Sequence, residues 1–151
     1  MTAVGTAASK RFISSAIVYG MAGARSPLER VRELCLSFPE TTERLSHGQP
    51  TWFVRDKKTF VMYLDNHHDD GRLALWCAAP DGMQAALVDG EPEHYFVPPY
   101  VGHRGWLGVR LDRELGWNEI AGAIEEAYAT IAPRRLVEQA VAEKNRASAR
   151  P

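Results

Sequence analysis

The polar stretch from Asn66 to Asp70 holds the side chains best suited to metal binding or proton transfer: one Asn, two His and two Asp in succession. Strong metal sites take their ligands from spaced positions, and calcium loops also need a following Glu that is missing here. Asn, His and Asp also occur in some formyl-transfer sites, but here they crowd into one turn and no phosphate-cradling glycine loop accompanies them. The sequence therefore favours a solvated loop, with no metal site and no cofactor.

Other catalytic patterns are also missing from the sequence. It contains neither GxSxG nor HExxH, and no pair of carboxylates that the sequence can place together in space. Three separate histidines, His47, His94 and His103, could meet in the fold, but a lone histidine in a turn or strand is usually structural. The sequence thus leans away from an enzyme, and we predict no catalytic residue.

The stretch from Pro98 to Asp112 combines a stiff loop, a basic turn and a strand. Its prolines restrict φ, and two glycines flank the His103-Arg104 pair, as in a turn. In the strand expected over 106–111, Leu and Val alternate with Trp106, Gly108 and Arg110. The leucine and valine side chains are expected to pack against a core. Trp106, Gly108 and Arg110 present an aromatic ring, bare backbone and a guanidinium on the other face, which either binds a ligand or faces solvent.

Basic side chains fall at two expected hairpin tips beside this outer face, on which Tyr63 and Trp76 are also expected. Cations for phosphates and flat rings for stacking are what a nucleic-acid binder needs. The candidate nucleic-acid-binding residues are Arg55, Lys57, Lys58, His103, Arg104, Trp106 and Arg110. Within residues 50–75, however, the basic and acidic side chains cancel, so a solvated sheet or a protein-contact face is at least equally favoured.

Composition indicates one ordinary soluble globular domain of 151 residues. The net charge of −1 provides no overall basic field for nucleic acid or an anionic membrane, so any such binding must be local. No segment is long and apolar enough to span a bilayer, and a cytoplasmic location is expected. Cys35 and Cys77 form no CxxC motif, and we interpret both as small buried hydrophobes.

Three regions are expected along the chain. Residues 1–25 are interpreted as a disordered leader or extension, although Lys10-Arg11 and the following apolar run weakly resemble a signal peptide, and Met21 is an alternative start. Residues 26–135 are expected to form the domain. Residues 136–151 are expected to form a helical or disordered basic tail.

Hydrophobic periodicity and turn residues predict an α+β fold with a twisted antiparallel sheet and helices on one face. A first helix should begin at Ser26 with a capping box and end before Pro39. Strands are expected over 41–47, 51–55, 59–64, 72–78, 94–97 and 106–111, and further helices from Pro80 to Gly90, from Gly116 to Ile131 and, more weakly, after Pro133.

Several segments in order make the chain resemble the MmcQ/YjbR family. They are Leu36-Ser37-Phe38-Pro39-Glu40-Thr41, Gly48-Gln49-Pro50-Thr51-Trp52-Phe53, Lys58-Thr59-Phe60, Leu75-Trp76-Cys77 and Pro98-Pro99-Tyr100 followed by Trp106 and Leu111-Asp112. The resemblance covers residues 27–135. It implies a CyaY-like fold with N- and C-terminal helices on one face of the sheet, and DNA binding through two hairpin wings, which would be Arg55–Lys58 and Gly102–Gly105 here.

The expected function is therefore weak, non-sequence-specific binding of double-stranded DNA by a small non-enzymatic protein, as a monomer or weak dimer. One alternative is an enzyme or small-molecule binder, which predicts a concave cleft near the Pro98–Trp106 turn containing His47, Tyr100 or His103. Another is a protein-interaction module, which predicts an exposed apolar patch.

Overall fold

The computed structural model describes residues 25–149. Residues 1–24 of the predicted leader and the last two residues of the predicted tail therefore lie outside the described residues. The chain divides into two units after Arg30, and residues 25–30 contain the start of α1 (Pro27–Leu36). The predicted capping box is confirmed there. The Ser26 N–H donates to Glu29 Oε1 at 2.8 Å, and the Glu29 N–H donates to Ser26 Oγ at 3.1 Å.

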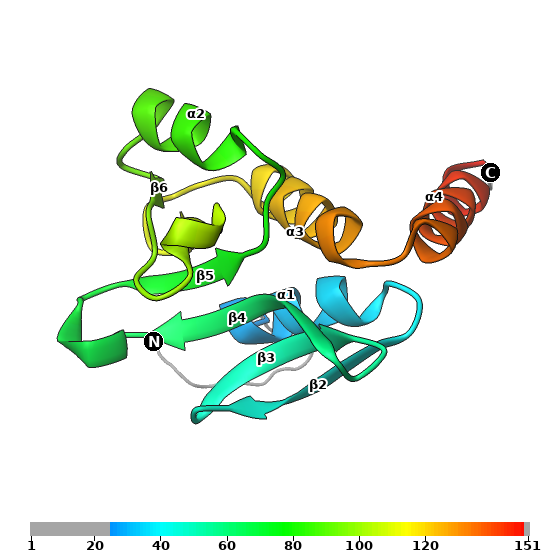
Figure 1. Cartoon of the computed structure of the whole chain (residues 1–151), viewed down its shortest axis with the longest axis horizontal. Helices are drawn as coiled ribbons and strands as arrows, with labels where there is room; N and C mark the ends of the chain where they lie inside the picture. The colour runs from blue at the N-terminus through cyan, green and yellow to red at the C-terminus, as the bar shows by residue number, and fades with distance from the viewer. Residues whose placement is uncertain (1–24, 150–151) are drawn as a thin grey trace, which may run out of the picture. The chain divides into compact units, whose positions relative to one another are not determined.

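The second unit is built on one antiparallel sheet of six strands, in the order β2-β3-β4-β5-β7-β6 (Figure 1). Strands β2 to β5 pair in sequence order as antiparallel hairpins, whereas β7 lies between β5 and β6. The strands are β2 (Thr41–Ser46), β3 (Gln49–Val54), β4 (Lys58–Asp65), β5 (Leu73–Cys77), β6 (Tyr95–Phe96) and β7 (Leu107–Arg110).

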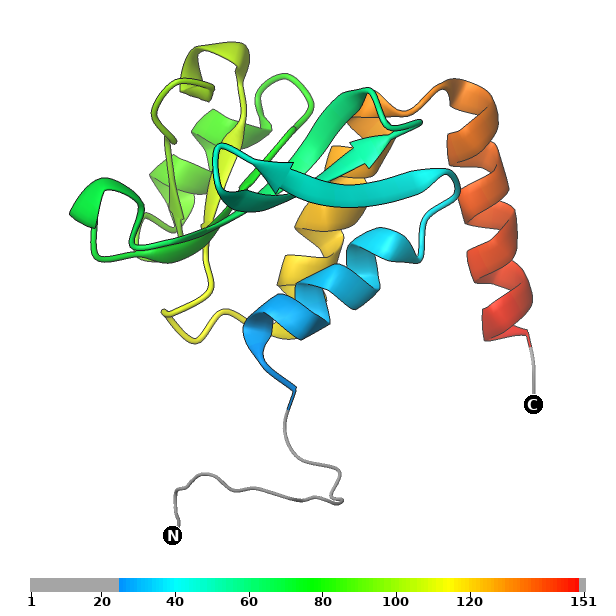
Figure 2. The ribbon, with the colours of Figure 1, turned by 90° about the horizontal axis from the view of Figure 1, so that it is seen from below.

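Helices accompany this sheet in the described part of the second unit. α3 (Trp117–Ile131) packs on β4 and β5, and α4 (Arg134–Ser148) turns back after Pro133 and runs beside it, where Lys144 pairs with Glu125 (Figure 2). α2 (Met83–Gly90) contacts β6, and two short 3₁₀ turns, η1 (His67–Asp69) and η2 (Gly102–Arg104), lie in loops. The predicted α+β class is confirmed. No helix within residues 25–149 is long and apolar enough to cross a membrane.

Aromatic side chains anchor α3 to the sheet. The Tyr128 ring stacks on Phe38 at a centroid distance of 4.5 Å and meets Phe60 edge-on at 5.6 Å. Its hydroxyl donates to the Pro39 carbonyl at 2.8 Å, and burial raises the pKa of Tyr128 to about 12. Cys35 and Cys77 are free buried thiols, and their burial in the core agrees with the interpretation as small hydrophobes.

A register shift changes which side chains of β4 face the helices. Between Trp52 and Phe53 the pairing with β4 slips, leaving Phe60 as an extra residue beside Val61. Phe60 therefore turns toward Tyr128, while Met62 lies opposite Trp76, and direct cross-strand partners point to the same side. The prediction that Tyr63 points away from the helices is wrong, because Tyr63 pairs with Leu75 on the helix side and Met62 takes the outer position.

The starts of β3 and α2 differ from the predicted ones by two and three residues. β3 begins at Gln49 because His47 and Gly48, with φ of 52° and 78°, form a tight two-residue hairpin turn. α2 begins at Met83, after Gly82 at φ 87°, and Pro80 lies before the helix.

Candidate nucleic-acid interface

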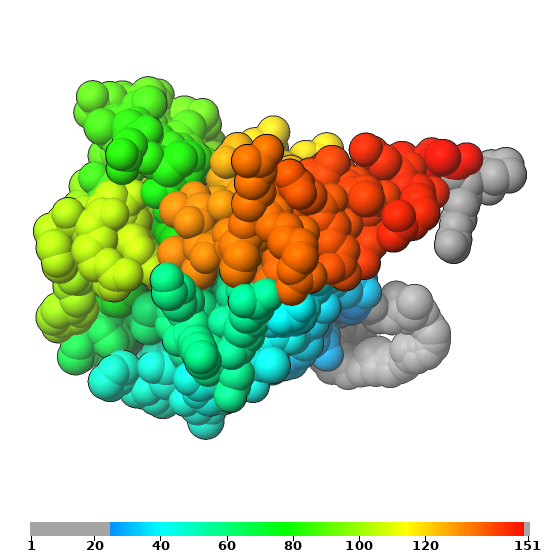
Figure 3. All heavy atoms as spheres, turned by 45° about the vertical axis from the view of Figure 1, so that its right-hand side comes forward, coloured from blue at the N-terminus to red at the C-terminus, as the bar shows by residue number. Residues whose placement is uncertain are grey.

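An open cavity of about 960 Å³ lies over the outer side chains of β4 and β5 and reaches Ile131, the last residue of α3. Its floor includes Met62 of β4 and Trp76 of β5, and the segment from Tyr100 to Trp106 forms one wall. Figure 3 shows that segment (yellow-green) and the β3–β4 hairpin (blue-green) on one visible face, beside the orange end of α3. This is the concave cleft that the small-molecule alternative predicted, and it contains His47 and Tyr100 but not His103.

The charged side chains that line this cavity are all basic. The permanent cations are Lys57, Lys58 and Arg104, and no Asp or Glu lies among the lining residues that the structure describes. No ion pair to these three cations occurs within residues 25–149. The cavity thus concentrates unneutralised positive charge although the whole chain is nearly neutral.

In the β3–β4 turn, two charged side chains form ion pairs within the protein and two others line the cavity. Arg55 and Asp56 have φ of 53° and 57°, which directs the chain back in a tight hairpin. The Arg55 Nε donates to Glu40 Oε1 at 3.0 Å, and Arg44 pairs with the Asp56 carboxylate. Lys57 and Lys58, which follow directly, are exposed and line the cavity. Of the predicted residues at this tip, the two lysines are therefore the available cations.

The second basic tip is η2, which α2 holds in place. The side-chain amide of Gln84 donates to the carbonyl oxygens of Gly102 at 2.9 Å and Trp106 at 2.6 Å. The Arg104 guanidinium lies 5.4 Å from the centre of the Trp106 ring, within the range of a cation–π contact. His103 and Arg104 are both exposed, and of the two only Arg104 lines the cavity.

The outer face of β7 is largely occupied by the protein itself. Trp106 is only 4 % exposed, and the Phe96 ring lies directly over Gly108. Arg110 makes two hydrogen bonds to the Asp112 carboxylate, at 2.9 and 3.1 Å, and these hold the pKa of Asp112 below its ordinary value. Neither the Trp106 ring nor the Arg110 guanidinium is thus free to meet a large ligand.

The loop from Asn66 to Asp70 is solvated, as predicted, apart from half-buried His67, and two of its side chains also bond the backbone. Asn66 Oδ1 accepts the Gly71 N–H at 2.8 Å, and Asp70 Oδ1 accepts the Arg72 N–H at 2.9 Å, so both side chains stabilise the loop. His67 is half-buried and meets the Trp76 ring edge-on at 5.2 Å. His67 and His68 therefore belong to the cavity wall.

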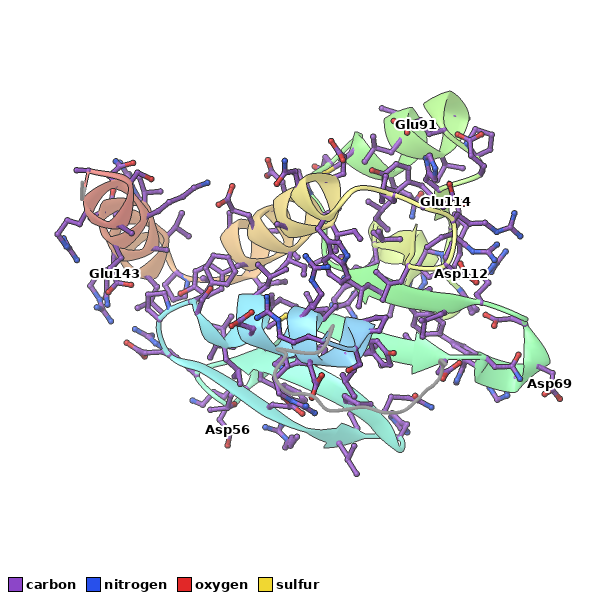
Figure 4. The ribbon with its side chains drawn as sticks, turned by 180° about the vertical axis from the view of Figure 1, so that it is seen from behind. Asp56, Asp69, Glu91, Asp112, Glu114 and Glu143 are labelled. Carbon is purple, nitrogen blue, oxygen red and sulfur yellow. The ribbon has the colours of Figure 1, made fainter. Side chains whose placement is uncertain are left out.

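Acidic side chains lie outside the cavity. In Figure 4, Asp56 lies at the β3–β4 turn and Asp69 in the β4–β5 loop, toward opposite ends of β4. Glu91, Glu93 and His94 place ligand atoms within 4.8 Å of one another, but this group is exposed and His94 already bonds Glu91 at 3.0 Å. It is an exposed acidic cluster after α2, and none of its three residues lines the cavity.

The cations of the cavity are visible in the sequence, whereas much of its wall is not. Gln84 carried no visible signal, because its role depends on a loop 18 residues away in the sequence. The contribution of His67 could have been suspected from its position just after the apolar strand Phe60–Leu64. The cavity itself depends on Tyr100 folding back over Trp76, with ring centroids 6.4 Å apart, which no local pattern predicts.

Comparison with known proteins identifies the family. Neither the curated proteins nor the solved structures contain a match to this chain. A family model described as YjbR matches residues 36–130, which is more than half of the chain and includes the whole sheet and nearly all of α3. The match agrees with the segments that carried the resemblance, and the chain belongs to the YjbR family.

Proposed function

We propose that this protein is a small non-enzymatic DNA-binding protein of the cytoplasm that holds phosphates between its two basic tips. The observation that carries the proposal is the absence of any carboxylate from the cavity lining within the described residues, where Lys57, Lys58 and Arg104 remain without ion-pair partners. When an unpaired cation of the protein contacts a phosphate, counterions are released from the nucleic acid, and this release favours binding. The family resemblance, which implies DNA binding through two hairpin wings, supports the same face.

The binding should be weak and independent of sequence. Three cations can neutralise few phosphates, and affinity from phosphate contacts alone is typically in the range of about 10⁻⁴ to 10⁻⁶ M at physiological salt. The Trp106 ring, which the sequence predicted as a contact, is buried, and Arg110 is held by Asp112. Sequence readout needs hydrogen bonds to base edges, for which a duplex lying on these tips finds few partners.

The test is a titration of a fluorescently labelled random-sequence duplex with the full chain, read by anisotropy at several salt concentrations. We expect micromolar binding whose logarithmic affinity falls linearly with the logarithm of salt concentration, with a slope of about −0.9 for each phosphate engaged. The triple variant Lys57→Ala, Lys58→Ala, Arg104→Ala should weaken binding equally for unrelated duplexes and make the slope shallower by about one unit for each lost contact.

A matched control changes the net charge by the same amount elsewhere. Arg134, Lys144 and Arg146 are exposed on α4, away from the cavity, and their replacement by Ala should leave affinity within about twofold. Equal losses in the two triple variants would mean that only total charge matters and would reject the assigned face. A wild-type chain that binds no duplex even at low salt would reject DNA binding altogether.

A second candidate function, the binding of a small anionic molecule, is favoured by the cavity volume. At about 960 Å³ the cavity lies at the upper end of the range of about 300–1,000 Å³ seen for ligand sites. Because a ligand that binds only the native state stabilises it by mass action, AMP or inorganic phosphate should then raise the melting temperature. A clear shift with either compound, together with no duplex binding, would favour this candidate over DNA.

A further inference from the structure

The cavity has two chemically different ends, placed along strand β4. Lys57 and Lys58 lie at the start of β4, and Leu64 and His67 lie at or just after its end. At about 3.3 Å per residue, the six steps from Lys58 to Leu64 separate the two ends by about 20 Å. A ligand that fills the cavity must therefore present negative charge at one end and suit a different surface at the other.

That other end is a cluster of aromatic rings. The Tyr100 ring lies 6.4 Å from His67, 6.3 Å from His68 and 6.4 Å from Trp76, between ring centroids. Trp76 is only 3 % exposed and backs the cluster, whereas Tyr100 is 68 % exposed and presents its ring to solvent. An exposed tyrosine that lies against one buried ring and two histidines offers a flat apolar surface at this end of the cavity.

Polar groups border the same aromatic end. The β2–β3 turn brings Ser46, His47 and Gln49 to the cavity, because Thr51 pairs with Met62 and the preceding residues run toward the end of β4. The side-chain amide of Gln49 has no hydrogen-bond partner within residues 25–149. An amide that lines the same cavity as a flat ring can both donate to and accept from the edge of a planar heterocycle.

From this arrangement we infer that the cavity binds single-stranded nucleic acid, with an unstacked base on Tyr100 and phosphates of the same strand at Lys57, Lys58 and Arg104. In a duplex the bases are stacked inside the helix and reach a protein only through the grooves, whereas a single strand can turn a base into a concave site. Aromatic rings joined to a basic track are the usual means of binding a single strand. The inference rests on the proposed function and adds a preference for single strands.

The experiment compares a labelled single strand with the duplex of the same sequence, using the full-length chain at one low salt concentration. Tyr100→Leu removes the ring but keeps an apolar side chain, and Tyr100→Phe keeps the ring. Because base stacking on an aromatic residue is lost with the ring, Tyr100→Leu should bind the single strand at least about fivefold more weakly. Tyr100→Phe should stay within about twofold of wild type, and neither variant should alter duplex affinity.

Val141→Ala serves as the control for an exposed apolar side chain, since Val141 lies on α4 and is also more than half exposed. Tighter binding of the single strand than of the duplex, with the selective loss in Tyr100→Leu, supports the inference. Equal binding of both forms with no effect of Tyr100→Leu overturns it, while the proposed function stands if the triple variant at Lys57, Lys58 and Arg104 still weakens both. Failure of both forms to bind overturns the proposed function as well.

Discussion

The side-chain amide of Gln84 donates a hydrogen bond of 2.6 Å to the carbonyl oxygen of Trp106. Its second amide hydrogen bond, of 2.9 Å, reaches the carbonyl oxygen of Gly102, so one side chain of α2 joins the first residue of η2 to Trp106, the residue before β7. Arg104 lies between those two points in the sequence. The orientation of the second basic tip therefore depends on a helix that does not itself contribute a cation to the cavity.

Replacing Gln84 by Ala should loosen this tip. Two hydrogen bonds of about 0.5–1.5 kcal/mol each are lost, so the free energy of unfolding should fall by about 1–3 kcal/mol, measured by urea denaturation. Nucleic-acid affinity should fall toward that of Arg104→Ala, because the guanidinium is no longer held over the cavity. Gln139→Ala is the control: Gln139 is an exposed glutamine of α4, bonded to Glu143, and its loss should change neither quantity measurably.

Arg110 should contribute to stability and not to binding. Its two hydrogen bonds to Asp112 are charge-assisted, and Asp112 also accepts the Leu73 N–H at 3.2 Å. Arg110→Gln should lower the free energy of unfolding by about 1–3 kcal/mol and leave duplex affinity within about twofold. A large loss of affinity with unchanged stability would instead make Arg110 a ligand contact.

Glu43 should make stability depend on acidity. It accepts hydrogen bonds from Arg32 Nε at 2.8 Å and from the Nε1 of the fully buried Trp52 at 3.0 Å. The bonds from Arg32, followed by its charge and the bond from Trp52, outweigh partial burial and lower the pKa of Glu43. Because the native pKa is lower than the unfolded one, the stabilisation is complete above the unfolded pKa and is lost as pH falls through the native pKa.

Glu43→Gln should accordingly reduce the free energy of unfolding at pH 7 by about 1–3 kcal/mol, and the difference from wild type should shrink at acidic pH. Urea denaturation at pH 7, 5 and 3 measures this directly. Glu138→Gln is the control, because the Arg134–Glu138 pair is largely exposed on α4 and such pairs contribute little. A difference at Glu43 that is constant across the three pH values would contradict the assignment.

Gly108 should not tolerate even a methyl group. A Cβ at this position would lie 2.5 Å from the Phe96 ring, which is itself held under the Arg72 guanidinium at 3.9 Å. Gly108→Ala should therefore displace the ring and lower the melting temperature, at a cost of about 1–3 kcal/mol. Gly122→Ala in α3 meets no atom within 4 Å and should instead stabilise the helix by about 0.5–1 kcal/mol.

Local sequence patterns predicted the elements with small boundary errors. The capping box at Ser26 and Glu29 acts between residues three apart, and the apolar stripe of α3 repeats within one helix, so both are visible in a short window. The β3–β4 hairpin follows from a charged tip between apolar arms. Fold class and the position of the two basic tips could therefore be predicted without tertiary information.

The outward-facing residues of β4 could not be predicted in the same way. Strict alternation assigns Tyr63 to the outer face, and a single extra residue at Phe60 reverses that assignment for the rest of the strand. The bulge is a property of the pairing between β3 and β4. A pattern within one strand contains no information about where its partner slips.

The sequence by itself determined the helices, the strands, the family resemblance and the two turns that bear cations, because each depends on neighbours in the chain. Only the tertiary structure decided which cations remain available: Arg55 meets Glu40 from 15 residues away, while Lys57 and Lys58 meet no acid among the described residues. It also buried Trp106 and left Tyr100 exposed beside His67. Charge pairing and burial depend on distances through space, and these are set when remote segments pack together.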